Sequence, residues 1–181
     1  MKLELPLQTE RLALRTLDPG ALSEQYLTWV NDPELTRFLE IRFRTHSRAD
    51  LSEFVSTMNQ SIDNLLLGLF VKADGRHIGN IKLGPVSAPH ERADIGLLIG
   101  DRSVWGKGYA TEAIRAVTSY GLGALGLHRI TAGMYEENVG SYKAFIKAGY
   151  SVDGRLKSYW RLDGRWQDEI ILHRLAERAD G

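Results

Sequence analysis

The stretch Trp105-Gly106-Lys107-Gly108-Tyr109-Ala110 follows a predicted strand at about 93–100 and opens a predicted helix, whose apolar residues recur every three or four positions. Gly106 and Gly108 can adopt positive φ angles and let the backbone come close to a ligand. The helix presents unpaired N–H groups and the positive end of its dipole at this point, and Lys107 adds a formal charge. The stretch therefore predicts an anion site of the kind that holds phosphate groups.

Two sharper phosphate motifs are excluded by the residues around this loop. A Walker-type loop needs Ser or Thr directly after Gly-Lys, and Lys107 is followed by Gly108. A dinucleotide fingerprint needs a third small residue where Thr111 stands and an acidic residue about 20 positions later, where His128 and Arg129 lie. A tight turn between strand and helix would also explain the two glycines on their own.

Hydrophobic periodicity on both sides of the loop predicts an α/β fold with a sheet of mixed direction. Strand patterns with a period of two, or short apolar runs, precede and follow helical patterns. The predicted strands are residues 9–17, 65–72, 77–84, 93–100, 129–135, 154–162 and 166–175, and the predicted helices lie within 21–60, after Ala110 and at 139–148. Asp74-Gly75 and Asp163-Gly164 predict two hairpin turns.

The composition is that of one ordinary globular domain. The chain has 181 residues, of which 43% are hydrophobic and 25% charged. It contains no cysteine, which excludes disulfides, thiolate metal sites and a cysteine nucleophile. A formal net charge of zero argues against general binding of nucleic acid. The start has no signal-like apolar region and no apolar stretch approaches about 18 residues, so we expect a cytoplasmic protein without a membrane partner. No histidine pair has metal-ligand spacing on a helix, so no metal is expected.

A second block supports the phosphate loop. Asn138–Tyr150 reads Asn-Val-Gly-Ser-Tyr-Lys-Ala-Phe-Ile-Lys-Ala-Gly-Tyr. With the loop, it resembles the GNAT superfamily of acyl-CoA N-acyltransferases, whose loop reads Gln/Arg-x-x-Gly-x-Gly/Ala and whose later segment reads Asn-x-x-Ser-x-x-x-Tyr-x-Lys-x-Gly-Phe. Trp105 departs from the first pattern. The residue sequence of the loop looks like that of the RimJ/RimL-type branch. So do the segments Thr9-Glu10-Arg11-Leu12 and Asn31-Asp32-Pro33-Glu34.

The resemblance implies a single-domain GNAT-like fold over residues 1–181, α/β (α+β) in class, with a mixed, mostly antiparallel central sheet and helices on both faces. It also implies acetyl-CoA as cosubstrate. The residues implied in binding it are Leu98, Ile99 and Gly100 for the pantetheine arm and acyl carbonyl, Gly106, Lys107, Gly108, Tyr109, Ala110 and Thr111 for the pyrophosphate, and Asn138, Ser141 and Phe145 for the far side. An N-cap role alone would explain Asn138, and core packing is the favoured interpretation of Phe145 and Tyr142.

Acyl transfer to an amine requires a group that takes the ammonium proton and stabilisation of the leaving thiolate. Asp94 is the first candidate for the base because it lies at the start of a strand, on the face of Leu98. An ion pair with Arg92, or a capping role at the end of the strand, would explain an aspartate at position 94 equally well. His90, His77 and Glu40 are alternatives.

The acid is harder to assign, because the tyrosine of the family pattern falls on Phe145. Ser141 is the candidate in its place, with Tyr142 and Tyr135 as alternatives. Direct attack by the amine is the simpler mechanism. A protein that kept the fold as a non-catalytic CoA-binding or regulatory module is the alternative function.

The acceptor would bind against the N-terminal helices and the last hairpin. Arg37, Arg42, Arg44 and Arg48 lie near only one acidic residue, Glu40, and indicate either a solvated face or a patch for an anionic acceptor. A nucleotide-linked amino sugar would be such an acceptor, and a protein N-terminus is the other amine acceptor considered. The candidate substrate-binding residues are Glu40, Arg42, His77 and Asn80. Tyr159, Trp160 and Trp166 in the final hairpin would suit either a homodimer surface or an acceptor wall.

Overall fold

The computed structural model describes residues 1–177, and residues 178–181 of the expected domain lie outside the described part. One sheet runs in the order β1-β2-β3-β4-β5-β6-β8-β7. Its strands are β1 Leu7–Gln8, β2 Leu12–Thr16, β3 Leu65–Val71, β4 His77–Leu83, β5 Arg92–Ile99, β6 Arg129–Tyr135, β7 Ser151–Leu162 and β8 Arg165–Leu175. All neighbouring strands are antiparallel except β5 and β6. The predicted mixed, mostly antiparallel sheet is confirmed.

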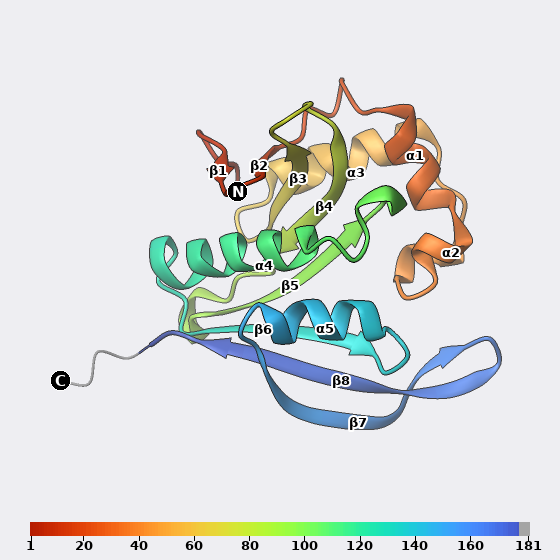
Figure 1. Ribbon diagram of the computed structural model, residues 1–181, viewed down its shortest axis with the longest axis vertical. Helices are drawn as coiled ribbons and strands as arrows, with labels where there is room; N and C mark the ends of the chain where they lie inside the picture. The colour runs from red at the N-terminus through yellow and green to blue at the C-terminus, as the bar shows by residue number, and fades with distance from the viewer. Residues whose placement is uncertain (178–181) are drawn as a thin grey trace.

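Helices cover both faces of this sheet, as expected (Figure 1). They are α1 Glu24–Asn31, α2 Pro33–Thr36, α3 Arg48–Gln60, α4 Tyr109–Ser119 and α5 Val139–Lys147, with short turns η1 Glu40–Phe43, η2 Ala88–His90, η3 Arg102–Val104 and η4 Tyr120–Ala124. In β3, Leu65 and Leu67 join the core cluster of α4 and α5, whereas Leu66 joins that of α1 and α3. Because successive strand side chains point to opposite faces, the two helix pairs lie on opposite sides.

The strand boundaries differ from the predictions by three residues at two places and by one residue at several others. The predicted strand 9–17 is β2 over Leu12–Thr16, preceded by the two-residue strand β1, which is too short to show a period. The strand predicted from residue 154 begins at Ser151, and register shifts between Val152 and Gly154 break the alternation there. The predicted strand 93–100 is shifted by one residue, to Arg92–Ile99.

The parallel pair β5–β6 opens into a gap. Its register covers Arg92↔Arg129, Ala93↔Ile130 and Asp94↔Thr131 only. Beyond Asp94, the described residues of β5 pair with β4 and those of β6 pair with β8. Figure 1 shows the two strands diverging toward α2. Backbone groups on the facing edges of the strands are therefore available to an extended ligand.

One face of the sheet beside this gap is not covered by α4 or α5. Alternation along each strand and the register between strands place five residues together on it: Asp94, Gly96, Gly133, Tyr135 and Glu169. We call this surface the open face. Leu98, two positions beyond Gly96, packs against the cluster of α1 and α3, so the open face continues the side on which those helices lie. None of the described helices is long and apolar enough to cross a membrane.

Candidate functional site

The predicted phosphate loop has the expected backbone. Gly106 and Gly108 adopt φ angles of 74° and 85°, and Gly108 is the N-cap of α4. No side chain caps this helix, so the amides of its first turn point outward unpartnered by a cap. Trp105, the residue that departs from the family pattern, donates its indole N–H to the carbonyl oxygen of Ile99 at 3.0 Å. This hydrogen bond joins the loop to the end of β5.

A clamp from the N-terminal segment holds the loop from one side. Glu112 accepts hydrogen bonds from the hydroxyl of Thr9 at 2.6 Å and from the backbone and side chain of Arg11 at 2.7 Å each. Arg11 also donates to the carbonyl oxygen of Lys107 at 2.9 Å. Partial burial opposes ionisation of Glu112, but the hydrogen bonds from Thr9 and Arg11 outweigh it and hold its pKa below the ordinary value. The segment Thr9-Glu10-Arg11-Leu12 thus positions the loop. We call it the first N-terminal signature, and Asn31-Asp32-Pro33-Glu34 the second.

The second N-terminal signature reaches the same loop from α2. Asp32 caps α2 by accepting from the amides of Glu34 and Leu35. Asp32 and Glu34 both pair with Arg102, at 3.0 and 2.8 Å. Arg102 lies in η3, directly before the loop. The two signatures therefore connect the N-terminal third of the chain to opposite ends of the β5–α4 connection.

Helix α5 carries the second block. Asn138 caps it by accepting from the amide of Ser141 at 3.2 Å, which confirms the cap role. Phe145 is 2% exposed and packs edge-on against Tyr150 at 5.0 Å, which confirms core packing. The same interpretation of Tyr142 is wrong, because this side chain is 36% exposed. Within α5 only Ala144 and Phe145 are buried, and the apolar residues Val139, Tyr142 and Ile146 are exposed.

The end of β5 lies where the cosubstrate arm is expected. The amide of Gly100 donates to the carbonyl oxygen of Ile78 at 3.0 Å, so this group is already engaged by β4. The indole of Trp29 packs on Gly100 so closely that an added Cβ would collide with it. Leu98 packs against the second core cluster, and Ile99 is partly buried beside the first. Of the three residues, Ile99 is the one bonded to the loop, because its carbonyl oxygen accepts from the indole N–H of Trp105.

Two carboxylates lie on the open face. Asp94, at the last pair of the β5–β6 ladder, is exposed. Glu169, opposite Tyr135 in the ladder, leans over Gly133, where an added Cβ would collide with its Oε1. Burial raises the pKa of Glu169, the neighbouring Trp160 N–H lowers it and the negative charge of Asp94 raises it further. Sequence reasoning missed Glu169, although the alternation of β8 places it on the face of Tyr135.

A polar cluster closes the open face at the end nearest η1. Tyr135 donates its hydroxyl proton to Glu40 at 2.8 Å and accepts from Arg42 at 2.8 Å. Burial and the hydrogen bond to Glu40 raise the pKa of Tyr135, against the effect of Arg42. Trp160 stacks on the Tyr135 ring at 5.0 Å, and Phe38 lies at 5.7 Å from it. Glu40 and Arg42, both predicted from the sequence, are thus held beside the gap.

His77 is half-buried and Asn80 is buried, both on the face of β4 beneath α1, and their expected contact with the acceptor stays a prediction. The His77 ring is packed by Tyr26, Trp29 and Phe70, and burial lowers its pKa. Asn80 is 5% exposed and its Oδ1 lies 3.0 Å from Nε2 of His77. Both side chains point from β4 into the cluster beneath α1, because β4 presents that face to the helix.

The arginine-rich segment is largely neutralised by ion pairs. Arg37 pairs with Glu137 and Asp163 at 3.2 and 3.1 Å, and Arg42 pairs with Glu40 at 3.2 Å. Arg48 pairs with Glu24. The neutralised guanidiniums favour the solvated-face interpretation over a patch for an anionic acceptor.

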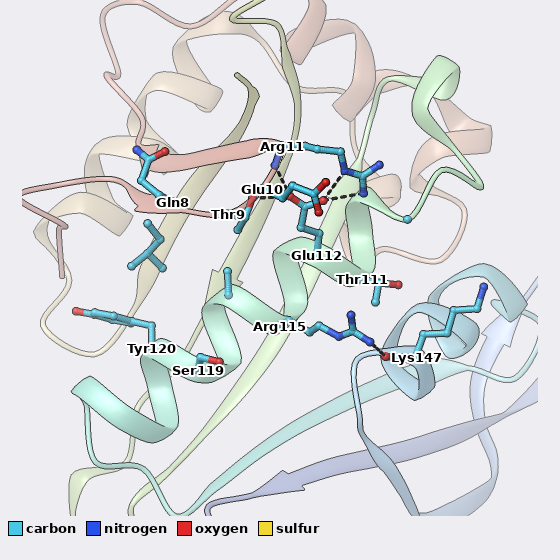
Figure 2. A pocket seen from close by; sticks show the side chains of 13 residues that line it. Gln8, Thr9, Glu10, Arg11, Thr111, Glu112, Arg115, Ser119, Tyr120 and Lys147 are labelled. Carbon is cyan, nitrogen blue, oxygen red and sulfur yellow. Dashed lines mark hydrogen bonds and ion pairs between the residues drawn. The ribbon is translucent and has the colours of Figure 1, made fainter. Parts of the chain in front are cut away.

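A pocket of about 890 Å³ lies between the N-terminal strands and the outer side of α4 (Figure 2). It borders the phosphate loop at Gly108 and Thr111, and Figure 2 shows Arg115 reaching toward Lys147 on its far side. None of the open-face residues lines it. This pocket and the open face are therefore separate features of the described residues. Among residues 1–177, no group of three or more His, Asp or Glu side chains could hold a metal ion.

Comparisons with known proteins agree with this fold. Residues 11–151 match the acetyltransferase (GNAT) domain family. The N-acetyltransferase p20 of Bacillus licheniformis is 31% identical over 97% of this chain and 98% of its own length. Spermidine N(1)-acetyltransferase of Escherichia coli (strain K12) is 29% identical over 56% of this chain and 54% of its own. The structure of spermidine N-acetyltransferase from Vibrio cholerae, in complex with CoA and spermine, covers 93% of this chain and 97% of its own, with a TM-score of 0.81 at 22% identity.

Proposed function

Because this chain belongs to the acetyltransferase (GNAT) family and is an acetyl-CoA-dependent N-acetyltransferase, we propose that its acceptor is the primary amine of a cationic molecule of the polyamine class. The observation that carries the proposal is the pair of carboxylates, Asp94 and Glu169, on the open face beside the β5–β6 gap. The two related spermidine acetyltransferases are in keeping with it. The N-terminal signatures support a place in the RimJ/RimL-type branch.

The donor end of the site follows from the loop and the gap. We expect the first-turn amides of α4, with Gly106 and Gly108, to bind the pyrophosphate of acetyl-CoA, because they combine unpaired N–H groups with the helix dipole. The pantetheine arm would lie along the free edge of β5 toward Ile99. Ser141, in the first turn of α5, would lie nearest the thiolate end of the cosubstrate.

The acceptor end follows from charge. Of the four arginines that suggested an anionic acceptor, Arg37, Arg42 and Arg48 are ion-paired, and Arg42 is also bonded to Tyr135. The open face instead presents Asp94 and Glu169, which attract an ammonium group. A polyamine carries further ammonium groups, so a carboxylate-lined face suits it better than a nucleotide diphosphate.

The reaction is direct attack in a ternary complex. The ammonium loses a proton with the help of Asp94, and the neutral nitrogen attacks the thioester carbonyl carbon. As the N–C bond forms and the C–S bond breaks, unpaired amides at the edge of the gap would stabilise the carbonyl oxygen. The second nitrogen proton passes to the sulfur, with Ser141 as the proposed donor partner of that thiolate.

An acceptor screen tests the proposal. The protein is incubated with acetyl-CoA and, in separate reactions, spermidine, a nucleotide-linked amino sugar and peptides with free N-termini, and thiol release is followed. We expect the highest kcat/KM with spermidine. A higher kcat/KM with the amino sugar or with a peptide would overturn the proposed acceptor class. Thermal stabilisation by CoA, measured in parallel, reports donor binding independently of the acceptor.

A further inference from the structure

The open face holds a second carboxylate that no sequence pattern singled out. Glu169 comes from β8, two strands away from Asp94 on β5, and both side chains lie on the same face of the sheet. Between the two strands runs β6, where Gly133 has no side chain. An added Cβ at residue 133 would collide with Oε1 of Glu169, so the carboxylate occupies the space above this glycine. Glu169 therefore points across β6 toward the gap.

Among the described residues, no Lys, Arg or His side chain forms an ion pair with Glu169. Its carboxylate lies beside the indole N–H of Trp160, and its ladder neighbour Tyr135 is already bonded to Glu40 and Arg42. The adjacent Asp168, by contrast, is paired with Arg155. A partly buried carboxylate next to a second negative charge is costly unless a cation joins them. The protonated acceptor amine is such a cation.

We propose that Glu169 is a second catalytic carboxylate, which together with Asp94 holds the acceptor ammonium at the mouth of the β5–β6 gap and takes up its proton. This inference rests on the proposed function. The ammonium gives one proton to the carboxylate pair, the nitrogen forms its bond to the acetyl carbon as the C–S bond breaks, and the second nitrogen proton goes to the thiolate. The products are the N-acetylated amine and CoA thiol, and the pair releases its proton to solvent.

Gly133 has a part in this arrangement because its missing side chain leaves room for the carboxylate. Its φ is not in the left-handed region, so alanine can adopt the same backbone. The atom that a methyl group would meet is the far end of a flexible side chain. Gly133→Ala should therefore move the Glu169 carboxylate while the sheet stays folded. Gly154 on β7 is the matched control, because an added Cβ there meets nothing within 4 Å.

The test measures kcat/KM for spermidine and the Kd of acetyl-CoA in the full chain. Glu169→Gln should lower kcat/KM by about 10²-fold, as expected for loss of a general base. Gly133→Ala should lower it in the same direction, by up to about 10²-fold through misplacement of the carboxylate. Gly154→Ala should match the wild type, and the Kd of acetyl-CoA should be unchanged in all three variants.

Wild-type kcat/KM in Glu169→Gln would overturn the assignment of Glu169 and leave the proposed function intact. The same holds if Gly133→Ala behaves like Gly154→Ala. Failure of the wild-type protein to acetylate any polyamine, while it still binds acetyl-CoA, would instead overturn the proposed acceptor and the assignment with it. Thermal unfolding of each variant shows whether the fold is retained.

Discussion

The guanidinium of Arg11 lies 2.6 Å from the carboxylate of Glu112, which joins the start of β2 to the first turn of α4. The same guanidinium donates to the carbonyl oxygen of Lys107 in the phosphate loop. The Glu112 side chain is only 15% exposed, so this ion pair is partly buried. It holds in place the loop whose amides are expected to bind the donor. We therefore expect the stability of the fold and the affinity for acetyl-CoA to be coupled at this pair.

Glu112→Gln tests this coupling. The substitution removes the charge that pairs with Arg11, and we expect the free energy of unfolding to fall by about 1–3 kcal/mol. The Kd of acetyl-CoA should rise, because the loop carbonyl loses its fixed partner. Glu10→Gln is the control, since Glu10 is exposed and adjacent to the clamp. Denaturant unfolding and calorimetric binding measure the two quantities, and equal values for both variants would contradict the clamp.

The pH dependence of stability gives a second test of Glu112. Its pKa in the folded protein is held below the ordinary value of 4.5. Its stabilisation is therefore fully present above that value and is lost as the pH falls through the lower, folded pKa. The difference in unfolding free energy between wild type and Glu112→Gln should shrink on acidification below about pH 4.5. A difference that grows below that pH would contradict a lowered pKa of Glu112 in the folded protein.

Gly106→Ala separates backbone strain from donor binding. At a φ of 74° the added Cβ costs about 1–2 kcal/mol of stability. Gly75, in the β3–β4 hairpin, has a φ of 71° and equally open surroundings, so Gly75→Ala should cost a similar amount. Only Gly106→Ala should weaken acetyl-CoA binding, because only that methyl group lies where the backbone meets the donor. Equal acetyl-CoA affinity in the two variants would remove Gly106 from the donor site.

Asp94→Ala tests the acceptor end. We expect a lower rate of acetylation with nearly unchanged affinity for acetyl-CoA, because Asp94 lies on the open face and not at the loop. Asp153→Ala is the control, since Asp153 lies in the same half of the sheet but pairs with Arg129 and His173. Steady-state kinetics and binding separate the two effects. Wild-type rates in Asp94→Ala would remove it from the mechanism.

The acid limb of the pH–rate profile reports the coupling between the two open-face carboxylates. Burial and the charge of Asp94 raise the pKa of Glu169, against the Trp160 N–H. A base is inactive when protonated, so kcat/KM should fall as the pH drops through this raised pKa. Asp94→Asn removes the negative charge, lowers the pKa of Glu169 and should shift the limb to lower pH. A shift to higher pH would contradict the coupling.

Local patterns in the sequence were sufficient for most of the fold and for the phosphate loop. The positive φ of Gly106 and Gly108, the cap by Asn138 and the hairpin at Asp74-Gly75 follow from residues next to one another in the chain, and the structure has them. Phe145 was assigned to the core from helical spacing alone. The same spacing failed for Tyr142, because periodicity does not show how wide the buried stripe of a short helix is.

The acceptor side depends on contacts between distant segments, which a single sequence does not reveal. Glu169 approaches Asp94 only because β8 lies next to β6 in the sheet, out of chain order. The partners of Arg37 lie in the β6–α5 connection and the last hairpin, so a run that looks basic in sequence is neutralised in space. His77 was a candidate for contact with the acceptor, yet it is packed by aromatic residues that come from α1 and β3.

The most direct test of the central claim compares a diamine with a monoamine of the same chain length as acceptors at saturating acetyl-CoA. The open face with Asp94 and Glu169 predicts a higher kcat/KM for the diamine, and this preference should decrease as ionic strength screens the charges. Equal kcat/KM values for the two amines, or a preference for the monoamine at low salt, would contradict recognition of a cationic acceptor at this face.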